Sequence, residues 1–380
     1  MPEISIDFTQ DPIPILSKIR QSAPGTLHIR CPAPTCTAEE NYLLLFEEFS
    51  PSFTFHSEKP CAVGPYDPQR LAIPTEPILP VTGEYLQSLC EYTVLNKEKS
   101  VEKHVWVAAA CPPERQLFIE EEWSPEVVQA AQSLFLYPMG DSCTSNCVFS
   151  RVWPRLRLIV FHNSDFSVDY SVIAKFLETH PNVHVWAENS IRWHPRIRCV
   201  PLGEENRIWR GGSVDYDPPI TISRKQTRSI NICMPHWGLT HPIRKQWREE
   251  AEALDISGLH RAPSMPKEEY LEFLTDCRAI LCPRGNGHDT HRVWECLAKG
   301  TWPIVQDNAH TQLLLRQYPS LPLLTIDSPE DLSISIPEGL PLFHPMLLRE
   351  FWRILYHSYL PQPHPVFEQE LQTCPPVINC

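Results

Sequence analysis

Apolar runs alternate with amphipathic segments through the second half of the chain. The short apolar runs predict buried strands at 229–234, 279–282, 302–305 and 323–326. The segments around them have the apolar spacing of helices, at 242–254, 266–277, 290–299 and 308–316. Strands that alternate with helices in this way are typical of a doubly wound α/β unit with a parallel sheet. The apolar run 341–359 predicts a closing helix.

A second alternating series begins near residue 156, and the pattern before it is weaker. The run LRLIVF at 156–161 predicts a buried strand, and 168–179 has helical spacing. Further short strands are predicted at 183–186 and 197–200. In the first 150 residues the apolar runs predict strands at 27–29, 53–55, 105–110 and 134–137, with helices at 38–48 and 84–95.

The polar stretch between these two series separates them. It contains Gly211-Gly212 and Asp215-Tyr-Asp217-Pro-Pro, which is typical of a connection between domains. A chain of 380 residues also exceeds what one hydrophobic core usually organises. The predicted division is an N-terminal Rossmann-like domain over 1–205, a linker over 206–228, a second Rossmann-like domain over 229–335, and a closing helix with a Pro-rich tail over 336–380.

Charge and cysteine content narrow the function classes. A net charge of −13 repels a polyphosphate backbone, so we expect no nucleic-acid partner, whereas a few arginines in one pocket suffice for a small anion. The 14 cysteines are scattered without CxxC pairs, which argues against a zinc ribbon. The N-terminus has no signal-peptide pattern, and no apolar run approaches the ~20 residues of a membrane span. We expect a cytoplasmic protein, in solution or peripheral to a membrane.

One segment of the second series carries phosphate-binding features. The predicted strand 279–282 leads into Pro283-Arg-Gly-Asn-Gly287, and a helix is predicted to begin at Asp289 or Thr290, since both are good N-cap residues. Glycines let backbone N–H groups approach an anion, and a helix N-terminus adds unsatisfied donors with partial positive charge. Strand, glycine loop and helix together therefore predict a phosphate cradle, although a single Gly-x-Gly is common in tight turns.

The predicted helix after this loop is amphipathic. Its polar side carries His288, His291, Arg292, Glu295 and Lys299, and its apolar side carries Val293, Cys296 and Leu297. Arg284 and Arg292 would neutralise a diphosphate leaving group, and Glu295 would accept hydrogen bonds from ribose hydroxyls. The alternative is a surface pair between Arg292 and Glu295 at i,i+3 beside a capped helix. The spacing alone leaves both open.

The stretch CPRGNGHDTHRVWECLAKGTWPIV closely resembles the C-terminal signature of the exostosin-like glycosyltransferase family. Members carry Pro-Arg-Gly-x-Gly-x-Asp-x-His-Arg-x-Trp-Glu before a Gly-x-x-Pro-Ile-Val strand. The resemblance is strongest over Ala279–Val305. A weaker resemblance to related transferases covers Leu156–Trp209, through FHNSDFSVD, VWAENS and IRCVPLGEENRIW.

The resemblance implies an α/β protein of the GT-B class, in which two Rossmann-like domains face a cleft, the C-terminal one binding the donor and the N-terminal one the acceptor. It further implies inverting transfer, usually from a UDP-sugar. Residues carried over to the donor site are Arg284, Gly285, Asn286, Gly287, Asp289, His291, Arg292 and Glu295. Thr290, as the helix start, and Arg244 are added to this donor set. Animal members have a membrane anchor that this sequence lacks, which puts glycosaminoglycan-type acceptors in doubt.

Inverting transfer needs a base that deprotonates the acceptor hydroxyl. Asp165 is the predicted base, because His162-Asn163-Ser164-Asp165 follows the strand at 156–161 and strand C-termini face the ligand crevice in open α/β sheets. An N-cap for the following helix is the alternative role of Asp165, which Ser167 would fill equally well. His162 and Asn163 are further cleft candidates, as is His236 after the first strand of the second half.

Metal and cofactor requirements are predicted to be small. Asp215-Tyr-Asp217 is similar to a metal-binding Asp-x-Asp motif, but it lies in the predicted linker, and arginines with a helix terminus can stabilise a diphosphate without Mg²⁺. We therefore expect no metal site, no essential divalent metal and no tightly bound cofactor. The expected partners are a nucleotide-sugar donor and a glycan or other hydroxyl acceptor, while the oligomeric state stays open. Alternative functions are a non-catalytic nucleotide-sugar or glycan-binding protein and a sugar-nucleotide epimerase.

Overall fold

The structure is a computed structural model. It describes residues 3–7, 25–30, 53–57, 80–96, 111–137, 147–206, 227–254, 258–319, 321–332, 335–341, 344–347 and 349–360. The chain divides into two compact units, one formed by Met1–Tyr66 with Glu350–Cys380 and one by Asp67–Arg349. Each unit is described by itself.

The first unit contains a small parallel sheet with the order β1-β2-β3. Its strands are β1 (Glu3–Asp7), β2 (Gly25–Arg30) and β3 (Phe53–Ser57). The predicted strands at 27–29 and 53–55 are present here, but they form their own sheet and are not part of the sheet that follows in the chain. Helix α13 (Arg349–Tyr359) lies within the closing helix predicted at 341–359 but begins eight residues later.

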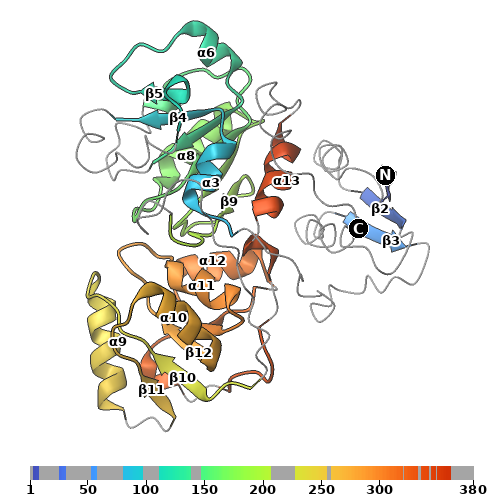
Figure 1. Ribbon diagram of the computed structural model, residues 1–380. Helices are drawn as coiled ribbons and strands as arrows, with labels where there is room; N and C mark the ends of the chain where they lie inside the picture. Colours follow the sequence, from blue (N-terminus) through green and yellow to red (C-terminus); the bar gives the residue numbers. More distant parts are fainter. Residues whose placement is uncertain are drawn as a thin grey trace. The chain divides into compact units, whose positions relative to one another are not determined.

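The second unit contains two parallel sheets (Figure 1). The first is six-stranded, with the order β5-β4-β6-β7-β8-β9. Its strands are β4 (Tyr92–Leu95), β5 (Gln116–Phe118), β6 (Ser133–Leu136), β7 (Leu158–Phe161), β8 (His184–Ala187) and β9 (Ile197–Cys199). Helices α3 (Gly83–Leu89), α6 (Pro125–Ala130) and α8 (Tyr170–Thr179) alternate with these strands, with a 3-10 turn η3 (Pro113–Arg115). All four residues of β6 and of β7 are buried, which explains their continuous apolar runs.

The second sheet of this unit is five-stranded, with the order β11-β10-β12-β13-β14. Its strands are β10 (Ile230–Met234), β11 (Leu259–Arg261), β12 (Cys277–Cys282), β13 (Trp302–Gln306) and β14 (Leu324–Ile326). Its helices are α9 (Pro242–Ala253), α10 (Lys267–Phe273), α11 (His291–Ala298) and α12 (Ala309–Gln317), with the 3-10 turns η5 (Leu274–Asp276), η6 (Pro329–Asp331) and η7 (Pro345–Leu347). Trp247, Leu281 and Ile304 lie in its core and are fully buried.

Both sheets have the same strand order relative to the chain. In each, the first strand lies between the second and the third, so the order runs 2-1-3-4 onward. A sheet of this kind binds its ligand beyond the carboxyl ends of the strands, where the direction of winding reverses. That point lies between β10 and β12 in the second sheet. The predicted α/β class with two Rossmann-like parallel sheets, as in a GT-B-like protein, is confirmed by this topology.

Several predicted elements differ from those observed. The helix expected at 84–95 ends at Leu89, and the rest of that segment is β4, because Thr93 and Val94 pair with β6 in the sheet. The edge strand β11 was not predicted, since only one of its three residues is buried. The helix expected at 266–277 ends as η5, and β12 begins at Cys277. The elements expected at 38–48 and 105–110 lie outside the described residues.

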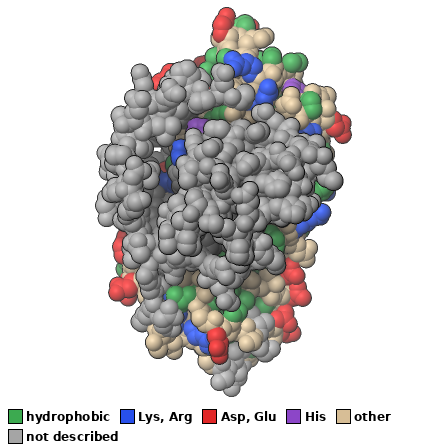
Figure 2. All heavy atoms as spheres, turned by 90° about the vertical axis from the view of Figure 1, so that its right-hand side faces the viewer, with side chains coloured by type: hydrophobic (Ala, Val, Ile, Leu, Met, Phe, Trp, Pro, Cys, Tyr) green, Lys and Arg blue, Asp and Glu red, His purple; other side chains and the backbone are tan. Residues whose placement is uncertain are grey.

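Two surface properties accompany this fold. On the face seen in Figure 2, acidic and basic side chains of the described residues are interspersed around the rim. Among the helices of the described ranges, none combines the length and the apolar character that crossing a membrane requires.

Candidate functional site

An open pocket of ≈ 440 Å³ lies at the point where the winding of the second sheet reverses. Pro235 and His236 follow β10 directly, and the loop with Pro263 and Met265 follows β11. Helix α11 and the start of α10 form the remaining wall. The charged and hydrogen-bonding side chains of the lining are Glu205, His236, Arg244, Ser264, Lys267, Tyr270, Thr290, His291, Arg292 and Glu295. The pocket therefore occupies the place where a parallel sheet of this order binds ligands.

Two arginines supply the pocket with positive charge. The Nε of Arg292 donates to the Oη of Tyr270 at 3.0 Å, and its terminal nitrogen donates to the carbonyl of His236 at 3.2 Å. Arg244 donates to the carbonyl of Arg284 at 2.9 Å. Burial, and then the nearby positive charge of Arg292, lower the pKa of Arg244 to about 10. Two guanidinium groups that repel each other in a partly buried site provide a favourable place for an anion.

Glu295 lies on the same wall but is not paired with Arg292. Its side chain is 4% exposed and forms an ion pair with Lys267, which lies 3.5 Å from Glu205 as well. Burial by itself raises the pKa of this carboxyl, but Lys267, His291 and Arg292 outweigh burial, so the pKa lies below its ordinary value. The alternative of an Arg292–Glu295 surface pair is therefore wrong, because each residue has a different partner and Glu295 is buried.

The glycine loop lies beside this pocket and does not line it. A Cβ at Gly287 would lie 2.9 Å from the side-chain nitrogen of Asn189, and one at Gly285 would lie 3.2 Å from a guanidinium nitrogen of Arg244. Both glycines therefore make room for neighbouring side chains. Asn286 is exposed, and its side-chain nitrogen lies 3.4 Å from the Oδ2 of Asp165.

Arg284 does not line this pocket. Its guanidinium donates to the carbonyls of Gly285 and Asn286 at 3.3 and 2.8 Å, and to the Nδ1 of His288 at 3.0 Å. It lines a second, much smaller cavity of ≈ 20 Å³, together with His288 and His310. Burial, and then the charge of Arg284, lower the pKa of His288 to about 4, so this imidazole is neutral at pH 7.

Asp289 and His291 bind the loop that follows β9. The Oδ2 of Asp289 accepts from the backbone N–H of Leu202 at 2.8 Å and from the indole of Trp294 at 2.8 Å. Its Oδ1 accepts from the N–H of Thr290 at 2.7 Å. The Nδ1 of His291 lies 2.8 Å from the carbonyl of Gly203. Helix α11 begins at His291, one residue after the predicted start, and Thr290 is its N-cap residue but makes no side-chain capping hydrogen bond.

Asp165 is exposed in the loop after β7, near Arg244. Its contact with Asn286 joins residues 121 positions apart, and its charge acts on Arg244. The N-cap of α8 is Asp169, whose Oδ1 accepts from Ser171 and Val172. The alternative role of Asp165 or Ser167 as the helix cap is therefore wrong, because α8 begins at Tyr170.

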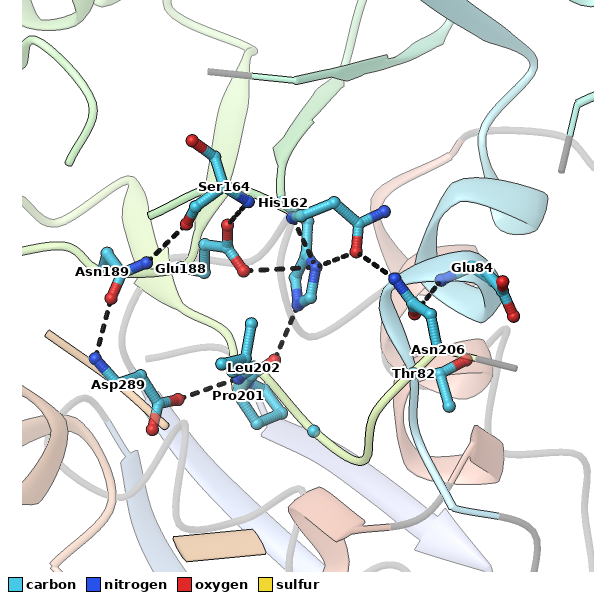
Figure 3. A network of polar contacts seen from close by, with 12 residues as sticks. Thr82, Glu84, His162, Ser164, Glu188, Asn189, Pro201, Leu202, Asn206 and Asp289 are labelled. Carbon is cyan, nitrogen blue, oxygen red and sulfur yellow. Dashed lines mark hydrogen bonds and ion pairs between the residues drawn. The ribbon is translucent and has the colours of Figure 1, made fainter. Parts of the chain in front are cut away.

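His162 and Asn163 are buried, and His162 belongs to the network of polar contacts in Figure 3. The Nε2 of His162 lies 2.8 Å from the carbonyl of Pro201, and its Nδ1 lies 3.3 Å from Glu188. Burial lowers the pKa of His162 to about 4 and raises the pKa of Glu188. Asn163 has a left-handed φ of 67° and accepts from Asn206 at 3.0 Å. Burial therefore favours the neutral forms of both His162 and Glu188.

Lys267, Tyr270, Glu188 and Asn189 are residues of this region that the sequence did not predict. No local signal identifies Lys267 or Tyr270, because both act through α11, more than 20 residues further along the chain. Glu188 and Asn189 follow β8 directly, so their position at a strand C-terminus was the available signal. Asp215 and Asp217 lie outside the described residues.

Comparison with known proteins gives no family assignment. No protein-family model and no curated protein matches the chain. Among solved structures, the calicheamicin glycosyltransferase CalG4 matches at 12% identity and a TM-score of 0.26, over 97% of this chain and 96% of that one. A protein from Listeria monocytogenes assigned as a UDP-N-acetylglucosamine 2-epimerase matches at 11% identity and a TM-score of 0.26, over 95% and 91%. An α-glucosyltransferase in complex with UDP-glucose and DNA containing an abasic site matches at 8% identity and a TM-score of 0.25, over 92% and 98%.

Proposed function

We propose that this protein is an inverting glycosyltransferase that transfers a sugar from a nucleotide-sugar, most simply a UDP-sugar, to a glycan or other hydroxyl acceptor. The observation that carries the proposal is the pocket of ≈ 440 Å³ between β10 and β12, with Arg244 and Arg292 in its wall. The exposed carboxylate of Asp165 lies close enough for its charge to act on Arg244. The resemblance of Ala279–Val305 to the exostosin-like glycosyltransferases supports the same assignment.

The pocket suits a nucleoside diphosphate. Two guanidinium groups offer two charges, while the third cation, Lys267, is already paired with Glu295. The first turn of α11 adds backbone donors and the positive end of the helix dipole. A leaving diphosphate gains negative charge as its bond to the sugar breaks, so donors fixed in place stabilise the transition state more than the bound substrate.

The reaction requires a proton acceptor on the opposite side of the sugar. In the proposed step the Asp165 carboxylate takes the proton of the acceptor hydroxyl, the freed oxygen attacks the anomeric carbon, and the bond to the diphosphate breaks. The bond pair leaves with the diphosphate, between Arg244 and Arg292. Attack from the face opposite the leaving group inverts the anomeric configuration. A divalent metal is not required in this scheme, because the arginines carry the charge compensation.

Nucleotide binding is the first test. A thermal-shift screen of the purified protein with UDP, GDP and CDP should show stabilisation by one of them. Arg292→Ala should weaken that binding about 10- to 100-fold, since a charge-assisted hydrogen bond contributes about 1.5–3 kcal/mol. Arg278→Ala is the matched control, because Arg278 lies at the other end of β12 and bonds to Asn231. Stabilisation by none of the nucleotides, or equal losses in both variants, would contradict the proposal.

Turnover is the second test, and it separates an enzyme from a binding protein. Release of nucleoside diphosphate from the nucleotide-sugar should fall about 10²- to 10⁴-fold in Asp165→Asn, the usual effect of losing a general base. Nucleotide affinity should stay near the wild-type value. Binding without turnover in the wild-type protein, unaffected by Asp165→Asn, would instead support a non-catalytic nucleotide-sugar-binding protein.

A further inference from the structure

Asn189 lies between the loop that carries Asp165 and the glycine loop. It is 1% exposed, follows β8 by two residues, and has a left-handed φ of 51°. Its Nδ2 donates to the carbonyl of Ser164 at 2.7 Å, and its Oδ1 accepts from the backbone N–H of Asp289 at 2.8 Å (Figure 3). A flipped amide would oppose acceptor to acceptor and donor to donor, so this orientation is the one that satisfies both groups.

The two hydrogen bonds of the Asn189 amide lie on either side of the contact between Asp165 and Asn286. Ser164 precedes Asp165, and Asp289 follows Asn286 by three residues, so Asn189 holds the backbone on each side of that contact. Gly287 supports the same arrangement, because a Cβ there would lie 2.9 and 3.0 Å from the two polar atoms of the Asn189 amide. A side chain at position 287 would therefore meet the Asn189 amide.

Glu188, the residue before Asn189, also binds the loop that carries Asp165. Its carboxyl accepts from the backbone N–H of Ser164 in a short contact and is fully buried. Both polar groups of the Ser164 backbone are thus bound by the pair Glu188–Asn189. Buried hydrogen bonds of this kind restrict a loop more than exposed ones do, because water does not compete for the groups.

The geometry points to Asn189 as a positioning residue that sets the spacing between the Asp165 carboxylate and the donor pocket. The effect of Asn189 on catalysis rests on the proposed transfer reaction. A base must lie within hydrogen-bond reach of the hydroxyl it deprotonates, and a displacement of about 1 Å can lower the rate about 100-fold. Asn189 does not line the donor pocket, so its loss should affect turnover and leave nucleotide binding intact.

The first test measures the contact itself. Asn189→Gly removes both hydrogen bonds and still permits the left-handed φ. Amide exchange at Asp289 should become about tenfold faster, the expected effect of losing a buried hydrogen bond. Asn163→Gly is the matched control, since Asn163 is also left-handed but bonds to Asn206. Equal exchange at Asp289 in the wild type and in Asn189→Gly would overturn the inference.

The second test uses the close approach of Gly287. Gly287→Ala should lower the melting temperature in the wild type, where the new methyl group meets the Asn189 amide. In the Asn189→Gly background the same methyl group enters the vacated space, so the loss should be much smaller. Effects of the two substitutions on the melting temperature that do not add would identify a direct contact between residues 189 and 287. An equal loss in both backgrounds would overturn it.

The third test separates positioning from stability. Asn189→Gly should keep the UDP affinity of the wild type while diphosphate release falls roughly 10- to 100-fold, as expected for a misplaced base. Unchanged turnover, or parallel losses of UDP affinity and turnover, would overturn the positioning role. If the wild-type protein binds no nucleotide, the proposed transfer is wrong, whereas the exchange and Gly287→Ala results still decide whether Asn189 spaces the two loops.

Discussion

Lys267→Met tests the charge arrangement of the pocket wall most directly. The substitution removes the ammonium and keeps an unbranched side chain of similar length. Glu295, with 4% of its side chain exposed, would then have a buried carboxylate without its ion-pair partner. Breaking a buried pair on one side is much more costly than its formation was favourable, and Glu295 would keep only the smaller effects of His291 and Arg292.

The expected loss of stability in Lys267→Met follows from the exposure of the Lys267 and Glu295 side chains. Two unit charges ~4 Å apart attract each other by about 4 kcal/mol at an effective dielectric constant of about 20. Because the Lys267 side chain is 31% exposed, water reaches the vacated site and recovers part of that energy. We therefore expect Lys267→Met to lower the free energy of unfolding by about 2–3 kcal/mol at pH 7.

Lys245→Met is the matched control for this measurement. Lys245 pairs with Glu249 at 3.6 Å on α9, but their side chains are 65% and 63% exposed. An exposed helical pair of this kind contributes about 0.3–0.5 kcal/mol. Urea unfolding followed by tryptophan fluorescence would measure both variants. Equal losses in the two would refute the assignment of a buried, charged Glu295.

The pH dependence provides an independent check with a definite sign. The pKa of Glu295 is lowered in the folded protein, so its contribution to stability is present above the unfolded pKa and is lost as the pH falls through the folded value. Lys267→Met removes the main cause of that lowering. The difference in stability between wild type and variant should therefore shrink as the pH is lowered from 7 to below about 4, near the unfolded pKa of a glutamate. A stability difference that stays constant with pH would mean that Lys267 does not lower the pKa of Glu295.

Two further predictions follow from the contacts of single residues. Arg284→Ala should weaken UDP binding less than Arg292→Ala in isothermal titration, because Arg284 binds the carbonyls of its own loop and does not line the larger pocket. His162 should make stability fall with acidification between about pH 6.5 and 4, by up to about 1.4 kcal/mol per pH unit, because burial lowers its pKa to about 4 and the unfolded chain binds the proton first. His162→Gln should flatten that dependence in urea unfolding measured at pH 5 and pH 7, and an unchanged slope would exclude His162 as its source.

Local pattern was sufficient to predict much of the second sheet. The strand at 302–305 and the helix at 308–316 lie within one residue of β13 and α12, because burial and helical periodicity are properties of neighbouring residues. The division of the first 150 residues was not predictable in the same way. β1, β2 and β3 have the apolar runs of any parallel strand, and only pairing over long separations places them in a sheet of their own.

The same distinction applies to the site. Spacing predicted a strand, a glycine loop and a helix at 279–299, and it predicted that Arg292 and Glu295 share one face. It did not predict the partners of those residues. Asp289 bonds to Leu202, 87 residues away, and Gly287 is small because Asn189 approaches it, 98 positions earlier in the chain. Such partners become neighbours only through the assembled fold.

The polar side chains of α11 both hold neighbouring segments in place and line the pocket. His291 contacts the loop after β9, Arg292 contacts Tyr270 of α10, and Glu295 contacts Lys267 at the start of the same helix. These contacts fix two wall segments of the pocket to one helix. A residue inserted into α11 would rotate its later side chains by about 100° and break the register of these contacts. The wall sets three cations, Arg244, Lys267 and Arg292, against two carboxylates, Glu205 and Glu295, which leaves one net positive charge, and Arg292 repels Arg244. That residual positive charge is the part of the motif that an anionic ligand would neutralise.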